Sequence, residues 1–367
     1  MSGRLAVFVP VVGQPSEIFL RRHVELIAPD RTVIVARRAA PPDQATWRTD
    51  LPVLWLDALS DEWGGRAEQL AVSEFLERHN VTAALLEYLD IWLPFLELFR
   101  ARGLTTVARG HGYDLSMRLR EPYWCDAYRS YADVDAVAVP SQHAVRRLTP
   151  IGLPSGRLHV VPNGVELPNR TWTGGEDGTV RVLAVGRLVP KKDPVATVRA
   201  CAAAARGGAR LHLTIAGDGP LRDDVRRAVE ASFLSCDLPG VLPHTRVLEL
   251  MGRGGIFCQH SVVDPQTGDE EGLPVAILEA MAHAMPVVST RHAGIPEMVE
   301  EGTTGFLVDE GDVEAMAERL ARLADDPSLR RRMGAAGRAR VNDGFTVERE
   351  CSALRALLRL DGDITST

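Results

Sequence analysis

The chain has 367 residues, of which 45% are hydrophobic and 25% charged, and its formal net charge at pH 7 is -7. This length favours two domains over a single core. The acidic balance argues against broad nucleic-acid binding, which needs a basic face, and no apolar run is long enough for a membrane-spanning helix.

Strand and helix patterns alternate through the first half of the chain. Runs rich in Val and Ile predict strands, and apolar residues at helical spacing predict helices. The predicted strands are 5–10, 32–36, 52–56, 81–88, 105–108, 134–139 and 157–161. The predicted helices are 17–26, 67–78, 91–102 and one that starts at Gln142, with Ser141 as its cap.

A break and a second alternation follow. Residues 168–179 have no periodicity and are rich in Gly and Thr, so they are the best linker in the chain. Beyond them we expect strands at 180–185, 211–216, 256–261 and 286–289, and helices at 194–205, 221–232, 244–251, 313–324, 328–341 and 347–360. A further helix should start at the Gly-Leu-Pro step that ends at Pro274.

Strands that alternate with helices predict parallel sheets covered on both faces. The fold class is therefore α/β, with two doubly wound domains. Ligands of such sheets bind beyond the carboxyl ends of the strands, and we expect the active site in a cleft between the domains. Candidate residues at strand ends are Gly13, His111, Ser141, Asn163, Arg187, Gly217 and Glu271.

The stretch 268–290 is the most informative. It combines Glu271 in a polar loop, a helix start at Gly272-Leu273-Pro274 and a second carboxylate, Glu279. The free N–H groups of a helix start bind anions, and carboxylates accept hydrogen bonds from diols. The pattern therefore suits a nucleotide-sugar. The alternative is an exposed loop acid and a solvated helix acid.

Cations and a histidine could complete such a site. Arg187 follows a strand, and Lys191 and Lys192 come shortly after it, so they could neutralise a leaving diphosphate. The alternative is a solvated basic turn. His111 lies between two glycines, where backbone can approach a ligand, although a lone histidine is more often structural. The turn at Gly217 fits phosphate or a plain turn equally well.

Other signatures point away from metal and disulfide chemistry. The two Asp-x-Asp triplets, at 133–135 and 361–363, lie at a strand start and in the tail, so no metal site is expected. No Walker motif is present, and no Gly-x-Gly-x-x-Gly follows the first strand. The five cysteines are scattered singly, which favours reduced thiols. The N-terminus lacks the apolar core of a signal peptide, so we expect a cytoplasmic location.

The chain resembles the retaining glycosyltransferases of family 4, which have the GT-B fold. The segment EEGLPVAILEAMAHAMPVVSTRHAGIPEMV carries the E-x7-E pattern of that family at Glu271 and Glu279. VGRLVPKKDP, IAGDGPL and VVPNGVE are also similar to family segments, and the resemblance covers nearly the whole chain. SEIFLRRHVELIAP and RGHGYDL are similar to the first domain of members that build polysaccharides and glycosylated natural products.

The resemblance implies a role for each candidate. Arg187 and Lys192 would hold the donor diphosphate, and Glu279 the ribose. Glu271 and the backbone of Gly272, Leu273, Pro274 and Val275 would contact the transferred sugar and its phosphate, with Gly217 also on the donor side. His111 would lie beside the reacting carbon and Gly13 in a loop near donor and acceptor. The catalytic set would be His111, Glu271, Arg187 and Lys192, acting with retention and without a metal or other cofactor.

The linker at 168–179 divides the chain into residues 1–168 for the acceptor side and 180–345 for the donor side, and the resemblance implies that a last helix near 346–360 crosses back to the first domain. Two departures stand out. The first loop is Val-Val-Gly-Gln rather than Gly-Gly, and His283-Ala284-Met285 replaces the usual Ala/Cys-Gly, which we expect to alter packing only.

The acceptor stays open between a small molecule, which the acidic charge favours, and a lipid-linked or polysaccharide acceptor at a membrane. A non-catalytic nucleotide-sugar-binding protein is the third alternative. The sequence leaves the donor base, the donor sugar and the oligomeric state open.

Overall fold

A computed structural model describes residues 3–14, 17–43, 45–59, 62–169, 171 and 178–360. The chain divides into two compact units. The first contains the residues up to Pro162 and those from Val347 onward, and the second is Asn163–Thr346. The change of unit therefore lies ahead of the expected linker at 168–179, of which residues 170 and 172–177 are outside the described part. Asp361 and Asp363 of the second Asp-x-Asp triplet are also outside it.

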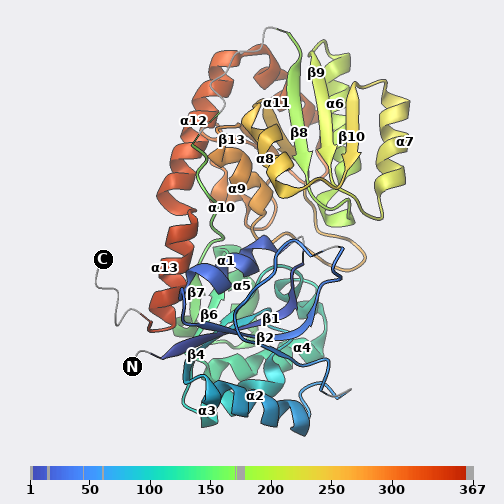
Figure 1. Ribbon diagram of the computed structural model, residues 1–367. Coiled ribbons are helices and arrows are strands. Elements are labelled where there is room, and N and C mark those ends of the chain that lie inside the picture. The colour runs from blue at the N-terminus through green and yellow to red at the C-terminus, as the bar shows by residue number, and fades with distance from the viewer. Residues whose placement is uncertain are drawn as a thin grey trace. The chain divides into compact units, whose positions relative to one another are not determined.

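The first unit is built on a parallel sheet of seven strands (Figure 1). Its strands are β1 (Arg4–Val12), β2 (Thr32–Ala39), β3 (Val53–Trp55), β4 (Val81–Glu87), β5 (Thr105–Arg109), β6 (Ala136–Val139) and β7 (Leu158–Val160). Their order is β3-β2-β1-β4-β5-β6-β7. The strand order reverses between β1 and β4, which makes the carboxyl ends of these two strands the expected place for a ligand.

Helices cover both faces of this sheet. On one face lie α1 (Ile18–Leu26) and the last helix, α13 (Val347–Leu357). On the other lie α2 (Arg66–Arg78), α3 (Leu96–Ala101), α4 (Pro122–Tyr128) and α5 (Gln142–Leu148). Successive residues of β1 alternate between the two cores, with Phe8 on the α2 side and Val7 on the α1 side, as a strand covered on both faces requires. Short 3₁₀ turns occupy Leu93–Phe95, Tyr113–Leu115, Arg118–Arg120, Arg129–Asp133, Thr149–Ile151 and Ser155–Arg157.

The second unit repeats the plan with six parallel strands. These are β8 (Val180–Val185), β9 (Leu211–Ala216), β10 (Cys236–Gly240), β11 (Ile256–Gln259), β12 (Val287–Thr290) and β13 (Gly305–Val308), in the order β10-β9-β8-β11-β12-β13. One face is covered by α6 (Pro194–Arg206), α7 (Arg222–Ser232) and α11 (Val313–Asp325). The other is covered by α8 (His244–Gly252), α9 (Val275–Ala282), α10 (Ile295–Met298) and α12 (Pro327–Gly344). The order reverses between β8 and β11.

The predicted α/β class with two doubly wound sheets is confirmed, and the differences have local causes. The expected helix at 91–102 is a 3₁₀ turn at Leu93–Phe95 followed by α3, because Pro94 cannot donate within a helix. β10 was not predicted, since this sheet-edge strand contains a proline and three exposed residues. The short elements β13, α4 and α10 were also not predicted.

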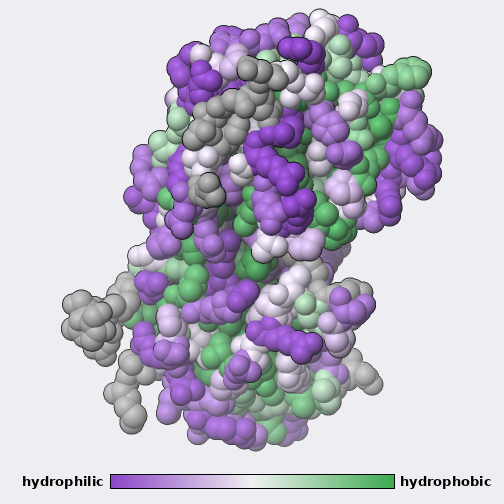
Figure 2. Space-filling model, turned by 45° about the horizontal axis from the view of Figure 1, so that its top comes forward, coloured by the Kyte–Doolittle hydropathy of each residue, from purple (hydrophilic) through white to green (hydrophobic). Residues whose placement is uncertain are grey.

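The surface of both units is mixed in polarity. On the face seen in Figure 2, hydrophilic and hydrophobic residues are interspersed over each unit. The large hydrophobic side chains exposed in the described residues include Phe233, Val241, Tyr123 and Leu70. Within the same residues, no helix combines the length and apolar character needed to cross a membrane.

Candidate active site

The loops after β8 and β9 pack tightly against each other at the carboxyl end of the second sheet. A Cβ atom on Gly217 would lie 1.9 Å from the Gly186 carbonyl oxygen, and Gly217 has a φ of +151°. The Leu188 N–H donates to the Asp218 carbonyl oxygen at 2.9 Å. Only glycine permits this approach at Gly217. This contact fixes the loop that carries Arg187, whose side chain is exposed at this edge of the sheet.

Glu271 is a buried carboxylate that faces two lysines. Its Oε2 accepts a hydrogen bond from Lys192 Nζ at 3.0 Å, and Lys191 Nζ lies 3.8 Å from its Oε1. Burial raises the pKa of Glu271, but Lys192 and Lys191 lower it further, so the net pKa is below its usual range. Among the described residues, Oε1 is buried without a hydrogen-bond donor. A buried acceptor of this kind is expected to find a partner.

A histidine, His292, accepts a hydrogen bond from the backbone of the loop that carries Glu271. The Glu271 backbone N–H donates to His292 Nε2 at 3.1 Å. The other ring nitrogen, Nδ1, therefore carries the proton and donates to Glu310 Oε1 at 2.6 Å. Lys191 adds a second support through Asp269 Oδ2, at 3.0 Å. The position of the Glu271 carboxylate is thus fixed by its backbone as well as by its ion pair.

Glu279 is the second predicted carboxylate, and it lies on α9. Its side chain is buried, and its Oε1 accepts a hydrogen bond from His244 Nε2 at 2.7 Å. His244 starts α8 and Glu279 lies in the middle of α9, so the contact joins two helices that cover the same face of the sheet. Pro274 is the N-cap of α9 rather than its first residue, and Val275 begins the helix. The N–H groups of the first turn then lack intrahelical acceptors.

His111 in the first unit is paired with a carboxylate that was not predicted. His111 Nε2–H donates to Glu87 Oε2 at 2.7 Å. Glu87 ends β4, next to β1, which is the point where the strand order reverses. The pKa of Glu87 is lowered well below its usual range: burial raises it, but His23 and His111 together lower it by more. Glu87 is therefore an anion at neutral pH.

The ring and backbone of His111 are held on several sides. Asp114 Oδ1 accepts from the backbone N–H groups of His111 at 3.0 Å and Gly112 at 2.9 Å. The rings of Phe19 and Tyr88 lie with their centroids 4.5 Å and 4.6 Å from that of the imidazole. Tyr88 has a φ of 71°, a conformation that is rare for a residue with a large side chain and often marks a functional site.

Gly13 lies at the carboxyl end of β1. Its φ is +93°, and a Cβ there would approach the Trp47 carbonyl oxygen to 3.1 Å. The Gly13 carbonyl oxygen accepts from the Thr46 N–H at 2.9 Å. The backbone at Gly13 is therefore packed beneath the segment around Thr46 and needs glycine.

The remaining sequence candidates have structural contacts. Ser141 Oγ accepts from the Ala144 N–H at 3.2 Å and caps α5. Asn163 Nδ2 donates to the Leu273 carbonyl oxygen at 3.2 Å, which ties the turn at 163–164 to the start of α9. Asp135 Oδ2 accepts from the Thr106 N–H at 2.8 Å. Ala284, in the segment expected to alter packing, has a φ of 59°, a conformation that favours glycine.

The structure groups the candidates by unit. Arg187, Lys192 and Gly217 belong to the second unit with Glu271 and Glu279, and the unit supplies His244, His292 and Glu310 as well. Gly13 and His111 belong to the first unit. The partners that sequence reasoning missed are polar residues at a helix start, at a strand end or in the loops that follow strands. Glu87 could have been found, because it ends a predicted strand that neighbours β1.

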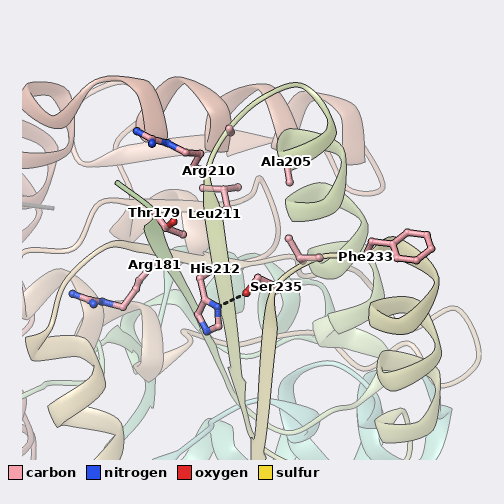
Figure 3. A pocket seen from close by; sticks show the side chains of 10 residues that line it. Thr179, Arg181, Ala205, Arg210, Leu211, His212, Phe233 and Ser235 are labelled. Atoms are coloured by element: carbon pink, nitrogen blue, oxygen red, sulfur yellow. Dashed lines mark hydrogen bonds between the residues drawn. The ribbon is translucent and has the colours of Figure 1, made fainter. Parts of the chain in front are cut away.

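An open hollow of about 720 Å³ lies elsewhere on the second unit (Figure 3). Arg181, Arg210 and His212 line it, and His212 Nδ1 is 2.8 Å from Ser235 Oγ. These residues are at the amino ends of β8 and β9, opposite the edge that carries Arg187 and Glu271. Ligands of doubly wound sheets bind at carboxyl ends, so this hollow is not the candidate site.

Two family models match the chain, "Glycosyl transferases group 1" over residues 173–340 and "Glycosyltransferase Family 4" over residues 24–168. The amylovoran biosynthesis glycosyltransferase AmsK of Erwinia amylovora is 32% identical over 241 residues, which are 64% of this chain and 59% of that protein. The alpha-maltose-1-phosphate synthase of Mycolicibacterium smegmatis is 31% identical over 314 residues, 77% of this chain and 73% of that protein. A putative colanic acid biosynthesis glycosyltransferase of Salmonella typhimurium matches over 53% of its length, so the chain spans little more than half of several relatives.

Solved structures share the fold. The structure of Anabaena HepE in complex with UDP superimposes with a TM-score of 0.79 at 15% identity and covers 97% of this chain and 99% of that one. The sucrose-phosphate synthase of Thermosynechococcus elongatus gives a TM-score of 0.75 at 19% identity, with 97% and 98% covered. The two family models together match both halves of the chain, and both sheets superimpose on these glycosyltransferase-fold structures. The chain belongs to the GT-B glycosyltransferases of group 1, family 4.

Proposed function

We propose that the protein transfers a sugar from a nucleoside-diphosphate sugar to a hydroxyl-bearing acceptor, with retention at the anomeric carbon and without a metal ion. The observation that carries the proposal is the Glu271 carboxylate. One of its oxygens is held by Lys192, and the other is buried without a hydrogen-bond donor among the described residues. A sugar hydroxyl would supply that donor.

The donor would bind across the carboxyl edge of the second sheet. Arg187 is exposed there, and the stem of Lys192 lies beside Gly186, within 3.0 Å of a Cβ built on that residue. Two cations would stabilise the diphosphate as negative charge grows on it. The backbone of Gly272, Leu273, Pro274 and Val275 would contact the same phosphates at the start of α9, with N–H donors from Gly272, Leu273 and Val275 only, because proline has no N–H.

Glu279 would bind the ribose. Its Oε1 is held by His244 at 2.7 Å, which fixes the carboxylate and leaves it acceptor capacity for a diol. Gly217 would let backbone approach the donor phosphate. In the first unit, His111 would act on the reacting sugar, and the Gly13 loop would approach donor and acceptor. With retention, the departing diphosphate would take the proton of the acceptor hydroxyl.

A thermal-shift screen with UDP, GDP, ADP and their sugars tests the donor part. A ligand that binds only the folded state at about 100 times its dissociation constant adds about 2.7 kcal/mol of stability. One base should raise the melting temperature of the wild type, and its sugar should be converted to the free diphosphate. EDTA should leave that conversion unchanged. Proton NMR of the product should show the anomeric configuration of the donor.

The acceptor has two candidates. A small molecule or natural-product intermediate fits the net charge of -7, which does not favour anionic membranes. A polysaccharide or lipid-linked acceptor is favoured by the relatives named for amylovoran and colanic acid biosynthesis. Sedimentation with anionic liposomes separates them, because strong binding would support the second. Donor binding without any turnover would instead indicate a non-catalytic nucleotide-sugar-binding protein.

A further inference from the structure

A row of buried ionisable side chains runs through the first unit from His111 to the last helix. His111 Nε2–H donates to Glu87 Oε2 at 2.7 Å, and His23 Nδ1–H donates to Glu87 Oε1 at 2.6 Å. His23 Nε2–H donates to Glu350 Oε1 at 3.0 Å, and Arg109 donates to the same oxygen. We call these five residues the His111 relay.

The relay joins segments that are distant in the sequence. Glu87 comes from β4, Arg109 from β5 and His23 from α1, whereas Glu350 is on α13. His23, Glu87, Arg109 and Glu350 are each no more than 2% exposed. Water therefore cannot replace a partner that is lost, and each charge depends on its neighbours.

The hydrogen bonds determine the protonation of His23. A carboxylate offers only acceptors, and His23 faces one carboxylate at each ring nitrogen. Both nitrogens must then carry protons, which makes His23 an imidazolium. With Glu87 and Glu350 as anions and Arg109 as a cation, the four inner charges cancel. The pKa of His23 agrees: burial lowers it, but Glu87 and Glu350 raise it further, to a net value above its usual range.

The relay also determines the tautomer of His111. Its Nε2 proton is committed to Glu87, so the neutral imidazole presents the lone pair of Nδ1. No other described side chain forms a hydrogen bond with Nδ1. Phe19 and Tyr88 restrict the ring at centroid distances of 4.5 Å and 4.6 Å. His111 is thereby held as a hydrogen-bond acceptor with one fixed orientation.

We propose that His23 and Glu350 are positioning residues for the transfer reaction. Glu350 on α13 holds His23, and His23 holds Glu87, so that His111 presents Nδ1 to a hydroxyl of the bound substrate. This inference rests on the proposed function of His111. Helix α13 then contributes a charged group to the site of the first unit, beyond covering its sheet.

The variant Glu350→Gln tests this with a matched control on the same helix. Arg355 also docks α13, through hydrogen bonds from its Nε to the Ile27 carbonyl oxygen at 2.8 Å and from its Nη2 to that of Leu26 at 3.2 Å. It has no contact with the relay. Arg355→Gln therefore weakens the docking of α13 and leaves the relay charges in place.

The first readout is imidazole ¹⁵N NMR of the full chain, which does not require activity. In the wild type at pH 7 we expect His23 to carry two protons, and we expect the neutral form of His111 to carry its proton on Nε2. A neutral His23 in the wild type would overturn the proposal even if the variant failed to fold. In Glu350→Gln, His23 should lose a proton at a lower pH than in Arg355→Gln.

The second readout is steady-state kinetics. Loss of a group that orients a reacting residue should reduce kcat about 10-fold to 100-fold in Glu350→Gln. The KM for the donor should stay within about twofold, and Arg355→Gln should change both constants by less than about twofold. Equal kcat in the two variants would refute the positioning role. If no donor is turned over but the NMR pattern is as expected, the proposed function fails and the relay geometry stands.

Discussion

The replacement Glu271→Gln removes a negative charge from a buried ion pair and leaves the shape of the side chain almost unchanged. Lys192 Nζ would lose its partner at 3.0 Å, and Lys191 its neighbour at 3.8 Å. The removal of one partner from a buried pair costs about 3–5 kcal/mol. Because the Lys192 side chain is 16% exposed, water can solvate it in part, and we expect the lower end, about 3 kcal/mol.

This loss is large enough to measure separately from activity. One kcal/mol shifts the melting temperature of a domain of about 150–250 residues by about 2–4 °C, so the second unit should melt about 6–12 °C lower. Turnover should fall about 100-fold to 1,000-fold, as it does when a single charge-stabilising group is removed from an active site. The assay is release of nucleoside diphosphate from the donor that the thermal screen identifies, measured well below the melting temperature.

Asp269→Asn is the matched control. Asp269 pairs with Lys191 at 3.0 Å in the same loop, and its side chain is 23% exposed, so its loss should cost about 1 kcal/mol and leave turnover within about twofold. If Glu271→Gln turns over donor as fast as Asp269→Asn does, Glu271 is only a structural partner of the lysines, and the reasoning is refuted.

Four further predictions follow from the same contacts. Arg187→Ala should leave the melting temperature unchanged because the side chain is exposed, but weaken binding of the nucleoside diphosphate about 10-fold or more; calorimetric titration measures this, and an unchanged affinity would exclude Arg187 from the phosphate site. Glu279→Ala should weaken binding of the nucleoside diphosphate more than that of inorganic diphosphate, which has no ribose; equal losses would argue against a ribose contact. Gly217→Ala should destabilise the second unit far more than Gly208→Ala, since a Cβ at Gly217 would be 1.9 Å from a backbone oxygen whereas nothing lies within 4 Å at Gly208, and denaturant unfolding compares the two. The pKa of His23 is raised on folding, so its contribution to stability should be complete below a pH of about 6.5 and should be lost as the pH rises through the pKa of His23 in the folded protein. His23→Gln should therefore flatten the dependence of the unfolding free energy on pH in that range.

The alternation of apolar runs was sufficient to predict both sheets, because buried parallel strands are short, continuous and rich in Val and Ile. β8 and β9 were predicted with the limits that the structure shows, 180–185 and 211–216. β10 was missed for the opposite reason. Its sequence, Cys-Asp-Leu-Pro-Gly, is polar in part and contains proline, and only its place beside β9 makes it a strand.

The site was less predictable than the fold. Glu271 and Glu279 lie in one short stretch with a helix start, so the sequence itself places them together. The sequence does not reveal their hydrogen-bond partners, because His292 and His244 are brought to them by the packing of other elements. The same holds for Glu350, which lies more than 200 residues from Arg109 along the chain yet forms an ion pair with it. No local pattern reports a partner at such a separation, and the expected return of the last helix to the first domain rested on family resemblance.

The central claim is that a nucleotide-sugar is bound and cleaved at the carboxyl edge of the second sheet, with Glu271 facing the sugar. The most direct test is the rate at which the purified protein releases nucleoside diphosphate from its preferred nucleotide-sugar in the presence of acceptor, compared between wild type and Glu271→Gln at equal fractions folded. We predict a measurable rate for the wild type and a rate reduced by at least about 100-fold for the variant. Equal rates in the two proteins would contradict the claim.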